Sequence, residues 1–251
     1  MTDDAHIRVV DLTKSYEGQL VLKGVTFDVL RGQTNMVIGR SGSGKTVLMR
    51  QIIRLEEPDS GSIFLDDVDI AHMPEGRLSR LRYKFGMVFQ MSALFDSLTV
   101  FDNVAFPLEE HTKLNKAAIH ERVMDKLSAL GIAEAWNKLP SHISGGMAKR
   151  AAVARALVME PEILIYDEPT SGLDPIAART VDDMIAEMQE RFSVTALVIS
   201  HDLESVTRIA DRVNVLHAGK IAVSSTPAEL LASDHPVVRE YLLAAGQNLD
   251  A

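Results

Sequence analysis

Eight residues near the start of the chain follow the pattern G-x-x-x-x-G-K-[ST]: Gly39-Arg40-Ser41-Gly42-Ser43-Gly44-Lys45-Thr46. The pattern comes after a short apolar run, Asn35 to Ile38, and before a segment from Val47 to Leu55 that suits a helix. In this context glycines let backbone N–H groups face phosphate oxygens, and the helix N-terminus favours an anion. We expect Lys45 to reach the β- and γ-phosphates and the Thr46 hydroxyl to bind Mg²⁺. The loop alone predicts a bound nucleotide and no more, because kinases and GTPases share it.

Two carboxylates, Asp167 and Glu168, end a continuous apolar run from Ile163 to Tyr166. Such a run is typical of a buried parallel strand. A carboxylate at the end of such a strand, beside a phosphate loop, holds Mg²⁺ through water, and Asp167 is predicted to do so. Glu168 is placed to orient and deprotonate an attacking water, which is worth roughly 10²–10⁴ in rate. Without the phosphate loop, the same residues would equally fit a strand end in solvent.

A second glycine pair, Gly145-Gly146, follows Ser144 and opens a segment of helix-forming residues. Ser144 suits an N-cap, and the glycines leave N–H groups open to an anion. Because one phosphate loop already serves one nucleotide, we expect this second loop to cap the γ-phosphate of ATP bound to another copy. Taken alone, these residues also fit an ordinary helix start.

The composition narrows the class of protein. The chain has 251 residues, 46% apolar and 24% charged, which indicates a globular protein of one large domain or one domain with an inserted subdomain. A net charge of −9 argues against a nucleic-acid partner, which would require clustered Lys and Arg. With no cysteine, disulfides and thiolate zinc sites are excluded. No stretch approaches the roughly 20 apolar residues of a membrane helix, so any membrane role requires docking on other chains.

Short strands alternate with helices along the chain, which predicts an α/β fold with a parallel sheet. Strands are expected at 7–10, 20–22, 25–29 and 61–65, with Gly18, Gly24 and Gly32 between them, and buried strands at 35–38, 163–166 and 195–199. Helix formers dominate from Leu114 to Leu157. Asp174-Pro175 predicts a helix N-terminus, and Thr226 with Glu229 predicts a capping box.

Five motifs occur in the order and spacing of ABC transporter ATPases, which the chain resembles over nearly its whole length. They are the phosphate loop, Gln90, Ser144-Gly145-Gly146, Asp167-Glu168 and His201. The resemblance implies a P-loop NTPase (RecA-like) core with an N-terminal antiparallel β subdomain, within one domain of residues 1–251. It assigns residues 1–90 and 160–251 to the nucleotide-binding core and residues 91–159 to an inserted α-helical subdomain. It also implies an ATPase that acts as a dimer of two copies, with ATP and Mg²⁺ in each site.

The same resemblance gives roles to residues that carry no signal alone. Tyr16 is similar to the aromatic residue on which adenine stacks, and Gln90 to the glutamine that touches Mg²⁺ and senses the membrane partner. His201 resembles the histidine that contacts the γ-phosphate, and Val47 adds to the ATP contacts. Asp174 ends a segment, Ser171-Gly172-Leu173-Asp174, that resembles the loop communicating across the dimer, and the resemblance implies that Asp174 contacts the ATP of the other copy.

Two segments resemble the ATPases of Mla-type lipid transport systems: Ser144 to Ala152, and Ser92 to Leu108. This resemblance implies phospholipid traffic between inner and outer membranes, with the chain held on the cytoplasmic side of the inner membrane by a transmembrane permease. An MCE-domain lipid-binding protein and a small STAS-domain subunit are further expected partners. Leu94, Phe95 and Phe101 are expected to receive the permease, unless they pack the domain's own core.

The chain departs from the usual family pattern at Ile143 and Met147, which flank the Ser-Gly-Gly centre, and at Arg40, which has no assigned role. One alternative is the ATPase of an amino-acid or other small-solute importer, whose signature would end in glutamine. Another is a soluble ABC-type regulator of ribosomes or DNA, which would carry two cassettes or long coiled-coil insertions.

Overall fold

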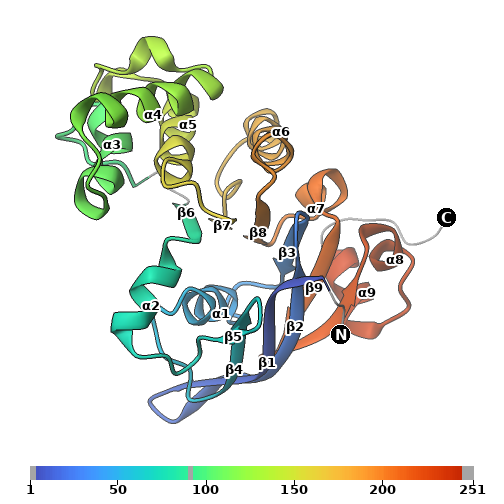
Figure 1. Ribbon diagram of the computed structural model, residues 1–251. Helices are drawn as coiled ribbons and strands as arrows, with labels where there is room; N and C mark the ends of the chain where they lie inside the picture. Colours follow the sequence, from blue (N-terminus) through green and yellow to red (C-terminus); the bar gives the residue numbers. More distant parts are fainter. Residues whose placement is uncertain (1–3, 90–92, 245–251) are drawn as a thin grey trace. The chain divides into compact units, whose positions relative to one another are not determined.

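The computed structural model describes residues 4–89 and 93–244 and divides the chain into two compact units (Figure 1). One unit comprises Met1–Arg82 and Asp167–Ala251, and the other comprises Tyr83–Tyr166. The limits expected for the subdomains, near residues 90 and 160, stay a prediction.

An antiparallel sheet in the order β2-β1-β4-β5 forms the start of the first unit. Its strands are β1 (Ala5–Tyr16), β2 (Gln19–Leu30), β4 (Ser60–Leu65) and β5 (Val68–Asp69). Val9 of β1 lies opposite Phe27 of β2 and Ile63 of β4, and all three side chains are buried. Alternate residues of β1 therefore supply one apolar face of this sheet. The antiparallel β subdomain predicted for the N-terminus is confirmed.

Gly24 lies inside strand β2, where the sequence predicts a break between two strands. Its φ of 86° belongs to the left-handed region. The register between β1 and β2 shifts at this point, because Leu12 pairs with Val25 whereas the next residue, Thr13, pairs with Lys23. Gly24 therefore forms a bulge within one strand and does not end it.

A parallel sheet forms the core of the first unit, with β3 (Thr34–Ile38) between β8 (Thr195–Ser200) and β9 (Arg212–His217). Strand β10 (Lys220–Ser225) pairs antiparallel with β9. Every residue of β3 and β8 is buried, as expected for parallel strands covered on both faces. Because β3 and β8 run in the same direction, the residues that follow Ile38 and Ser200 emerge at the same edge of the sheet. This edge carries the candidate site.

Six helices belong to the first unit within the described residues: α1 (Lys45–Ile52), α2 (Glu75–Arg82), α6 (Pro175–Phe192), α7 (Leu203–Ile209), α8 (Pro227–Leu231) and α9 (Pro236–Ala244). Helix α1 begins at Lys45 rather than at Val47, because Gly44 in left-handed conformation already acts as its N-cap. The predicted caps are confirmed: Asp174 caps α6, and Thr226 and Glu229 form a capping box at α8.

The second unit is mainly helical. It contains the neighbouring strands β6 (Phe85–Phe89) and β7 (Ile163–Asp167, whose last residue belongs to the first unit), helices α3 (Val100–His111), α4 (Lys116–Ala129) and α5 (Gly145–Leu157), and 3₁₀ turns η1 (Ala133–Ala135) and η2 (Pro140–His142). The three α-helices pack against one another. Ser144 caps α5 as predicted, its hydroxyl accepting from the N–H of Met147.

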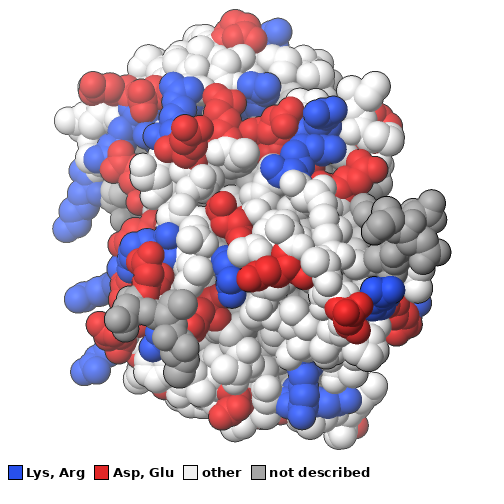
Figure 2. Space-filling view, turned by 90° about the vertical axis from the view of Figure 1, so that its right-hand side faces the viewer, with Lys and Arg blue, Asp and Glu red and all other residues white. Residues whose placement is uncertain are grey.

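Within the described part of the chain, no helix is both long and apolar enough to cross a membrane. Acidic and basic side chains are interspersed over the face drawn in Figure 2.

Candidate functional site

The phosphate loop connects β3 to α1, as the sequence predicts. Its first glycine, Gly39, packs so closely on β9 that an added Cβ would lie 2.4 Å from the carbonyl oxygen of Leu216. Its last glycine, Gly44, has a φ of 103°, a conformation that L-residues with a side chain rarely adopt. The two glycines thus fix both ends of the loop, and α1 begins with its free N–H groups beside it.

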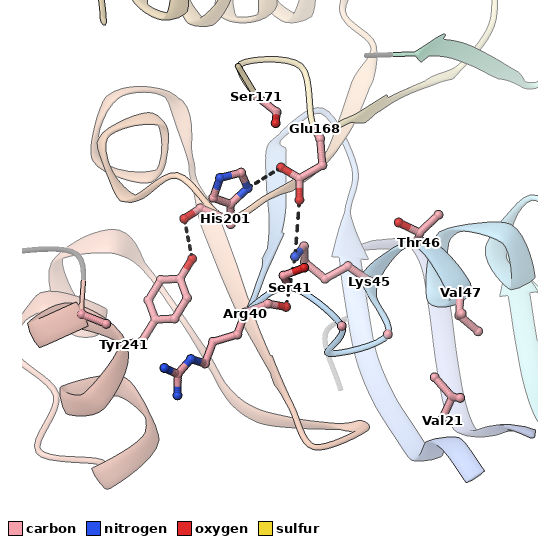
Figure 3. A pocket seen from close by; sticks show the side chains of 13 residues that line it. Val21, Arg40, Ser41, Lys45, Thr46, Val47, Glu168, Ser171, His201 and Tyr241 are labelled. Carbon is pink, nitrogen blue, oxygen red and sulfur yellow. Dashed lines mark hydrogen bonds and ion pairs between the residues drawn. The ribbon is translucent and has the colours of Figure 1, made fainter. Parts of the chain in front are cut away.

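Lys45, the first residue of α1, is buried and folds back over this loop (Figure 3). Its ammonium donates to the carbonyl oxygens of Gly39 at 2.8 Å and Arg40 at 3.3 Å. It also forms an ion pair with Glu168, with 3.3 Å between Nζ and Oε1. The cation is therefore held where phosphate oxygens would meet it.

Glu168 contacts both the lysine of the phosphate loop and the residues at the end of β8. Its other carboxylate oxygen lies 2.6 Å from Nδ1 of His201, and its backbone N–H donates to the carbonyl of Ile199 at 2.8 Å. Its φ of 48° is unusual for a residue other than glycine. Such conformations cost of order 1–3 kcal/mol and cluster at functional sites. The fold therefore keeps Glu168 in a costly conformation that aims its carboxylate at Lys45 and His201.

Asp167, the last residue of β7, has a half-buried carboxylate next to this group. Burial, and then the neighbouring charge of Glu168, raise the pKa of Asp167 above its usual value. Its Oδ1 is buried and has no hydrogen-bond partner within the described residues. An oxygen ligand left unpaired in this way fits a hard cation such as Mg²⁺. The Thr46 hydroxyl, which lines the nearby cavity, is a second oxygen suited to that ion.

A cavity of about 870 Å³ lies over the phosphate loop, and thirteen residues of the first unit line it. Nine of them are predicted site residues: Arg40, Ser41, Gly42, Gly44, Lys45, Thr46, Val47, Glu168 and His201. The other four are not among the predicted ATP-site residues, although Ser171 belongs to the segment predicted to communicate across the dimer: Val21 of β2, Ser171, and Tyr241 and Ala244 of α9. Neither Gly39 nor Ser43 lines the cavity, since Gly39 faces β9 and the Ser43 hydroxyl is buried.

Tyr16 ends β1 and is half-exposed, but it is not among the residues that line the cavity. Its hydroxyl donates to the carboxylate of Glu56, and Lys14 Nζ lies 5.7 Å from its ring centre. Burial, followed by the hydrogen bond to Glu56, raises the pKa of Tyr16 to about 12. The role of Tyr16 as an adenine platform stays a prediction.

Ser144, Gly145 and Gly146 are exposed at the start of α5 in the second unit. A Cβ added to Gly145 or Gly146 would meet nothing within 4 Å among the described atoms. The first turn of this helix therefore offers N–H groups to solvent, a geometry that binds anions.

Asp174 uses Oδ1 to cap α6, accepting from the N–H groups of Ile176 and Ala177 at 3.0 Å each. Ser171, earlier in the same loop, lines the cavity. Ile176 is 81% exposed, which is high for so apolar a residue. A contact of Asp174 with ATP of another copy stays a prediction.

Gln90 lies outside the described residues, and strand β6 ends just before it at Phe89. After the gap, Phe95 is exposed and packs on Phe106 with 5.0 Å between ring centres. Buried Asn103 holds the backbone here: it accepts from the N–H of Phe95 and donates to the carbonyls of Phe95, Leu98 and Thr99. Leu94 and Phe101 are only partly exposed. Neither Phe106 nor Asn103 was singled out from the sequence.

A phosphate loop on a parallel sheet, with a carboxylate and a histidine beside its lysine, defines the class of P-loop nucleoside triphosphatases. Comparison with known proteins narrows this class. The family model described as "ABC transporter" matches residues 22–171. The chain belongs to the ABC transporter ATP-binding family, whose members hydrolyse ATP.

Two kinds of relatives cover most of the chain. "Intermembrane phospholipid transport system ATP-binding protein MlaF" of Escherichia coli (strain K12) is 40% identical over 92% of this chain and 86% of its own length. "Probable ribonucleotide transport ATP-binding protein mkl" of Mycobacterium leprae (strain TN) is 39% identical over 94% of this chain and 68% of its own. The chain thus spans about two thirds of the mycobacterial protein.

Solved structures agree with this assignment. CbiO1 from Clostridium perfringens, part of the ABC transporter complex cbiONQ, superposes with a TM-score of 0.85 at 33% identity, over 96% of this chain and 95% of its own. The ATP-binding cassette MJ0796, solved as a dimer bound to ADP and phosphate, has a TM-score of 0.77 at 27% identity, over 88% of this chain and 98% of its own. The α/β fold predicted from the sequence is confirmed.

Proposed function

We propose that the chain is the ATP-hydrolysing subunit of a transporter that moves phospholipid between the inner and outer membranes. The observation that carries this proposal is the 40% identity to MlaF over 92% of the chain. The Ser-Gly-Gly centre at the start of α5, exposed in this structure, adds support.

The reaction is the attack of water on the γ-phosphorus of ATP, which breaks its bond to the bridging oxygen and yields ADP and phosphate. Glu168 accepts the proton of the attacking water, and the Lys45 ammonium stabilises charge on the β- and γ-phosphates. His201 faces the γ-phosphate while Glu168 orients its ring through Nδ1. Thr46 and Asp167 would hold Mg²⁺, which neutralises charge on the phosphate oxygens.

In this proposal the working unit is a dimer. Each chain brings one phosphate loop and one Ser144–Gly146 loop, and each nucleotide lies between the phosphate loop of one copy and the Ser144–Gly146 loop of the other. The outward exposure of Gly145 and Gly146 supports a ligand supplied from outside the chain. The dimeric state of MJ0796, bound to ADP and phosphate, supports the same arrangement.

The transmembrane partner is a permease, and the chain lies on the cytoplasmic side of the inner membrane through that contact. Phe95 and Phe106 support a docking site, since both rings are exposed and pack against each other at a tilt, and Asn103 hydrogen-bonds the backbone of Phe95. An exposed aromatic pair suits an amphipathic helix laid across it. An MCE-domain protein and a STAS-domain subunit complete the proposed assembly.

A second cargo has its own support. The mycobacterial relatives are named for ribonucleotide transport and are 38–39% identical to this chain. Coverage favours phospholipid, because the chain spans 86% of MlaF but 68% of the mycobacterial protein.

The experiment that tests the proposal purifies the chain with its membrane partner and reconstitutes both into liposomes. Fluorescent phospholipid transfer and radiolabelled ribonucleotide uptake are measured in parallel, with ATP and with a non-hydrolysable analogue. We expect phospholipid transfer that requires ATP hydrolysis and is lost in Glu168→Gln. Uptake of ribonucleotide without phospholipid transfer would contradict the proposed phospholipid cargo. ATP hydrolysis that never couples to a membrane partner would contradict the proposed role in a transporter.

A further inference from the structure

The C-terminal helix α9 reaches the phosphate cavity, although none of its residues was predicted to belong to the site. Val238 and Leu242 are buried and anchor the helix, whereas Leu243 is 61% exposed. Tyr241 and Ala244 line the cavity beside the phosphate loop. One face of α9 is therefore part of the fold's core, and another forms a wall of the candidate ATP site.

Tyr241 makes a direct contact with the segment that carries His201 (Figure 3). Its hydroxyl donates to the backbone carbonyl of His201 at 2.7 Å. Burial raises the pKa of the Tyr241 hydroxyl above its usual range, so the group stays protonated and remains a donor at neutral pH. The hydroxyl can therefore donate this hydrogen bond at the neutral pH at which ATP hydrolysis is measured.

The carbonyl of His201 lies just beyond the sheet. The pairing of β3 with β8 ends at Ser200, and α7 begins only at Leu203. His201 thus sits in a short connection, while its side chain must hold Nδ1 2.6 Å from Glu168. A hydrogen bond to its main chain restricts the backbone from which the ring projects.

A second contact joins the same helix to the phosphate loop. Glu240, next to Tyr241, pairs with Arg40 at 2.6 Å between Oε1 and Nη1. Both side chains are more than half exposed, so the pair alone stabilises little. It nevertheless gives Arg40, the loop residue for which the sequence suggested no role, a partner on α9.

We propose that Tyr241 is a positioning residue for His201 and that the Arg40–Glu240 pair docks its helix on the phosphate loop. The C-terminal helix thereby braces two separate parts of the site, the loop that holds phosphate and the connection that carries the histidine. This inference rests on the proposed role of His201 in ATP hydrolysis.

The first test is Tyr241→Phe in the full chain, which removes one hydroxyl and keeps the ring. We expect kcat for ATP hydrolysis to fall about two- to tenfold, the range for one neutral hydrogen bond, because His201 is less well aligned. KM for ATP should stay within about twofold, since the phosphate loop is untouched. The matched control is Tyr83→Phe, which removes a hydroxyl from an exposed tyrosine of the other unit and should change neither constant. An unchanged kcat, or a loss of activity that only follows a loss of folded protein, would overturn the positioning role.

A second readout needs no turnover. In ¹⁵N-histidine-labelled protein, the ring resonances of His201, assigned by their disappearance in His201→Ala, should shift in Tyr241→Phe and stay in place in Tyr83→Phe. Resonances that coincide with those of the wild type would overturn the inference. This measurement also separates the two proposals, because a shifted His201 in a chain that moves no phospholipid argues only against the cargo.

The docking part is tested by Glu240→Gln, made alone and together with Tyr241→Phe. Alone, it should lower kcat by less than about twofold, as expected for an exposed ion pair. Combined with Tyr241→Phe, it should lower kcat by more than the product of the single effects, because the helix then loses both contacts. Effects that multiply independently would show that the pair does not help to place Tyr241.

Discussion

The phosphate loop of the first unit and the Ser144–Gly146 loop of the second both present backbone N–H groups at a helix start, yet their surroundings differ. Around the phosphate loop, Lys45 is buried and paired with Glu168, which in turn is bonded to His201. Around the second loop, a side chain added at either glycine would meet nothing within 4 Å among described atoms. In the proposed dimer, one half of the site (the assembled half) is built around the phosphate loop of one chain, and the other half (the displayed half) is the Ser144–Gly146 loop that faces the nucleotide of the second copy.

The largest effect is expected at the assembled half. Glu168→Gln should lower turnover by roughly 10²–10⁴, because an amide cannot accept the proton of the attacking water. ATP should still bind, so dimers should accumulate in its presence. Phosphate release and light scattering measure the two effects. The matched control is Glu187→Gln on the exposed face of α6, which should be near wild type. Turnover of Glu168→Gln within tenfold of the wild type would remove this residue from its role.

The Ser144–Gly146 loop should be equally necessary, because we expect the loop of one copy to complete the ATP site of the other copy. Gly145→Asp places a negative charge where the γ-phosphate is expected, and turnover should fall by about two orders of magnitude or more. Lys45→Ala should be comparably inactive. A one-to-one mixture of the two variants should recover about a quarter of wild-type turnover, because half of the dimers contain one intact composite site out of two. No recovery in mixtures with verified heterodimers would mean that each chain completes its site alone.

A smaller effect concerns the stability of the assembled half. The pKa of Asp167 is raised by burial, so the folded chain binds this proton more tightly than the unfolded chain does. The associated stability is present at low pH and is lost as pH rises through the raised pKa. At neutral pH in EDTA and without nucleotide, Asp167→Asn should therefore raise Tm by a few degrees, since ~1 kcal/mol corresponds to ~2–4 °C in a chain of this size. Turnover with Mg²⁺ should fall.

The matched control for that prediction is Asp67→Asn, at an exposed position, which should leave Tm unchanged. Scanning calorimetry at several pH values gives the comparison. A Tm of Asp167→Asn below that of the wild type at neutral pH would mean that the ionised carboxylate stabilises the metal-free fold.

The smallest effect on the isolated chain is expected at the surface of the second unit. Phe95→Asp removes a partly exposed ring and should lower the free energy of unfolding by only about 0.5–1.5 kcal/mol, the worth of its packing on Phe106. Basal ATP hydrolysis should persist, whereas copurification with the permease should be lost. Trp136→Gln, at another exposed aromatic residue of the same unit, should keep the permease. Loss of the permease in both variants, or in neither, would place the docking surface elsewhere.

The fold and the position of the phosphate loop between a strand and a helix could be predicted because their signals are local. A strand, a glycine loop and a helix follow one another within about twenty residues, and the caps at Ser144, Asp174 and Thr226 lie next to the helices they begin. Helix α3 was missed although Thr99 and Asp102 form a capping box at its start. Pro107 inside that helix conceals the pattern, because proline is expected to interrupt a helix.

The remaining wall of the cavity could not be predicted because its residues are distant in sequence. Tyr241 lies 40 residues after His201, and Glu240 lies 200 residues after Arg40. No periodicity or spacing connects such pairs, since only the packing of α9 brings them together. Gly24 is a case in which the local signal misleads. From sequence alone a glycine between two apolar runs predicts a turn, and only the pairing with β1 shows that it forms a bulge within one strand.

The ion pair between Lys45 and Glu168 restrains the proposed proton acceptor while no nucleotide is bound. In the proposed reaction an incoming triphosphate would compete with the carboxylate for the same ammonium group, so binding of the nucleotide would release the proton acceptor. Until that exchange, the residue that would activate water is restrained by the cation it must later give up. In the proposed mechanism ATP must therefore bind before Glu168 is free to activate the attacking water.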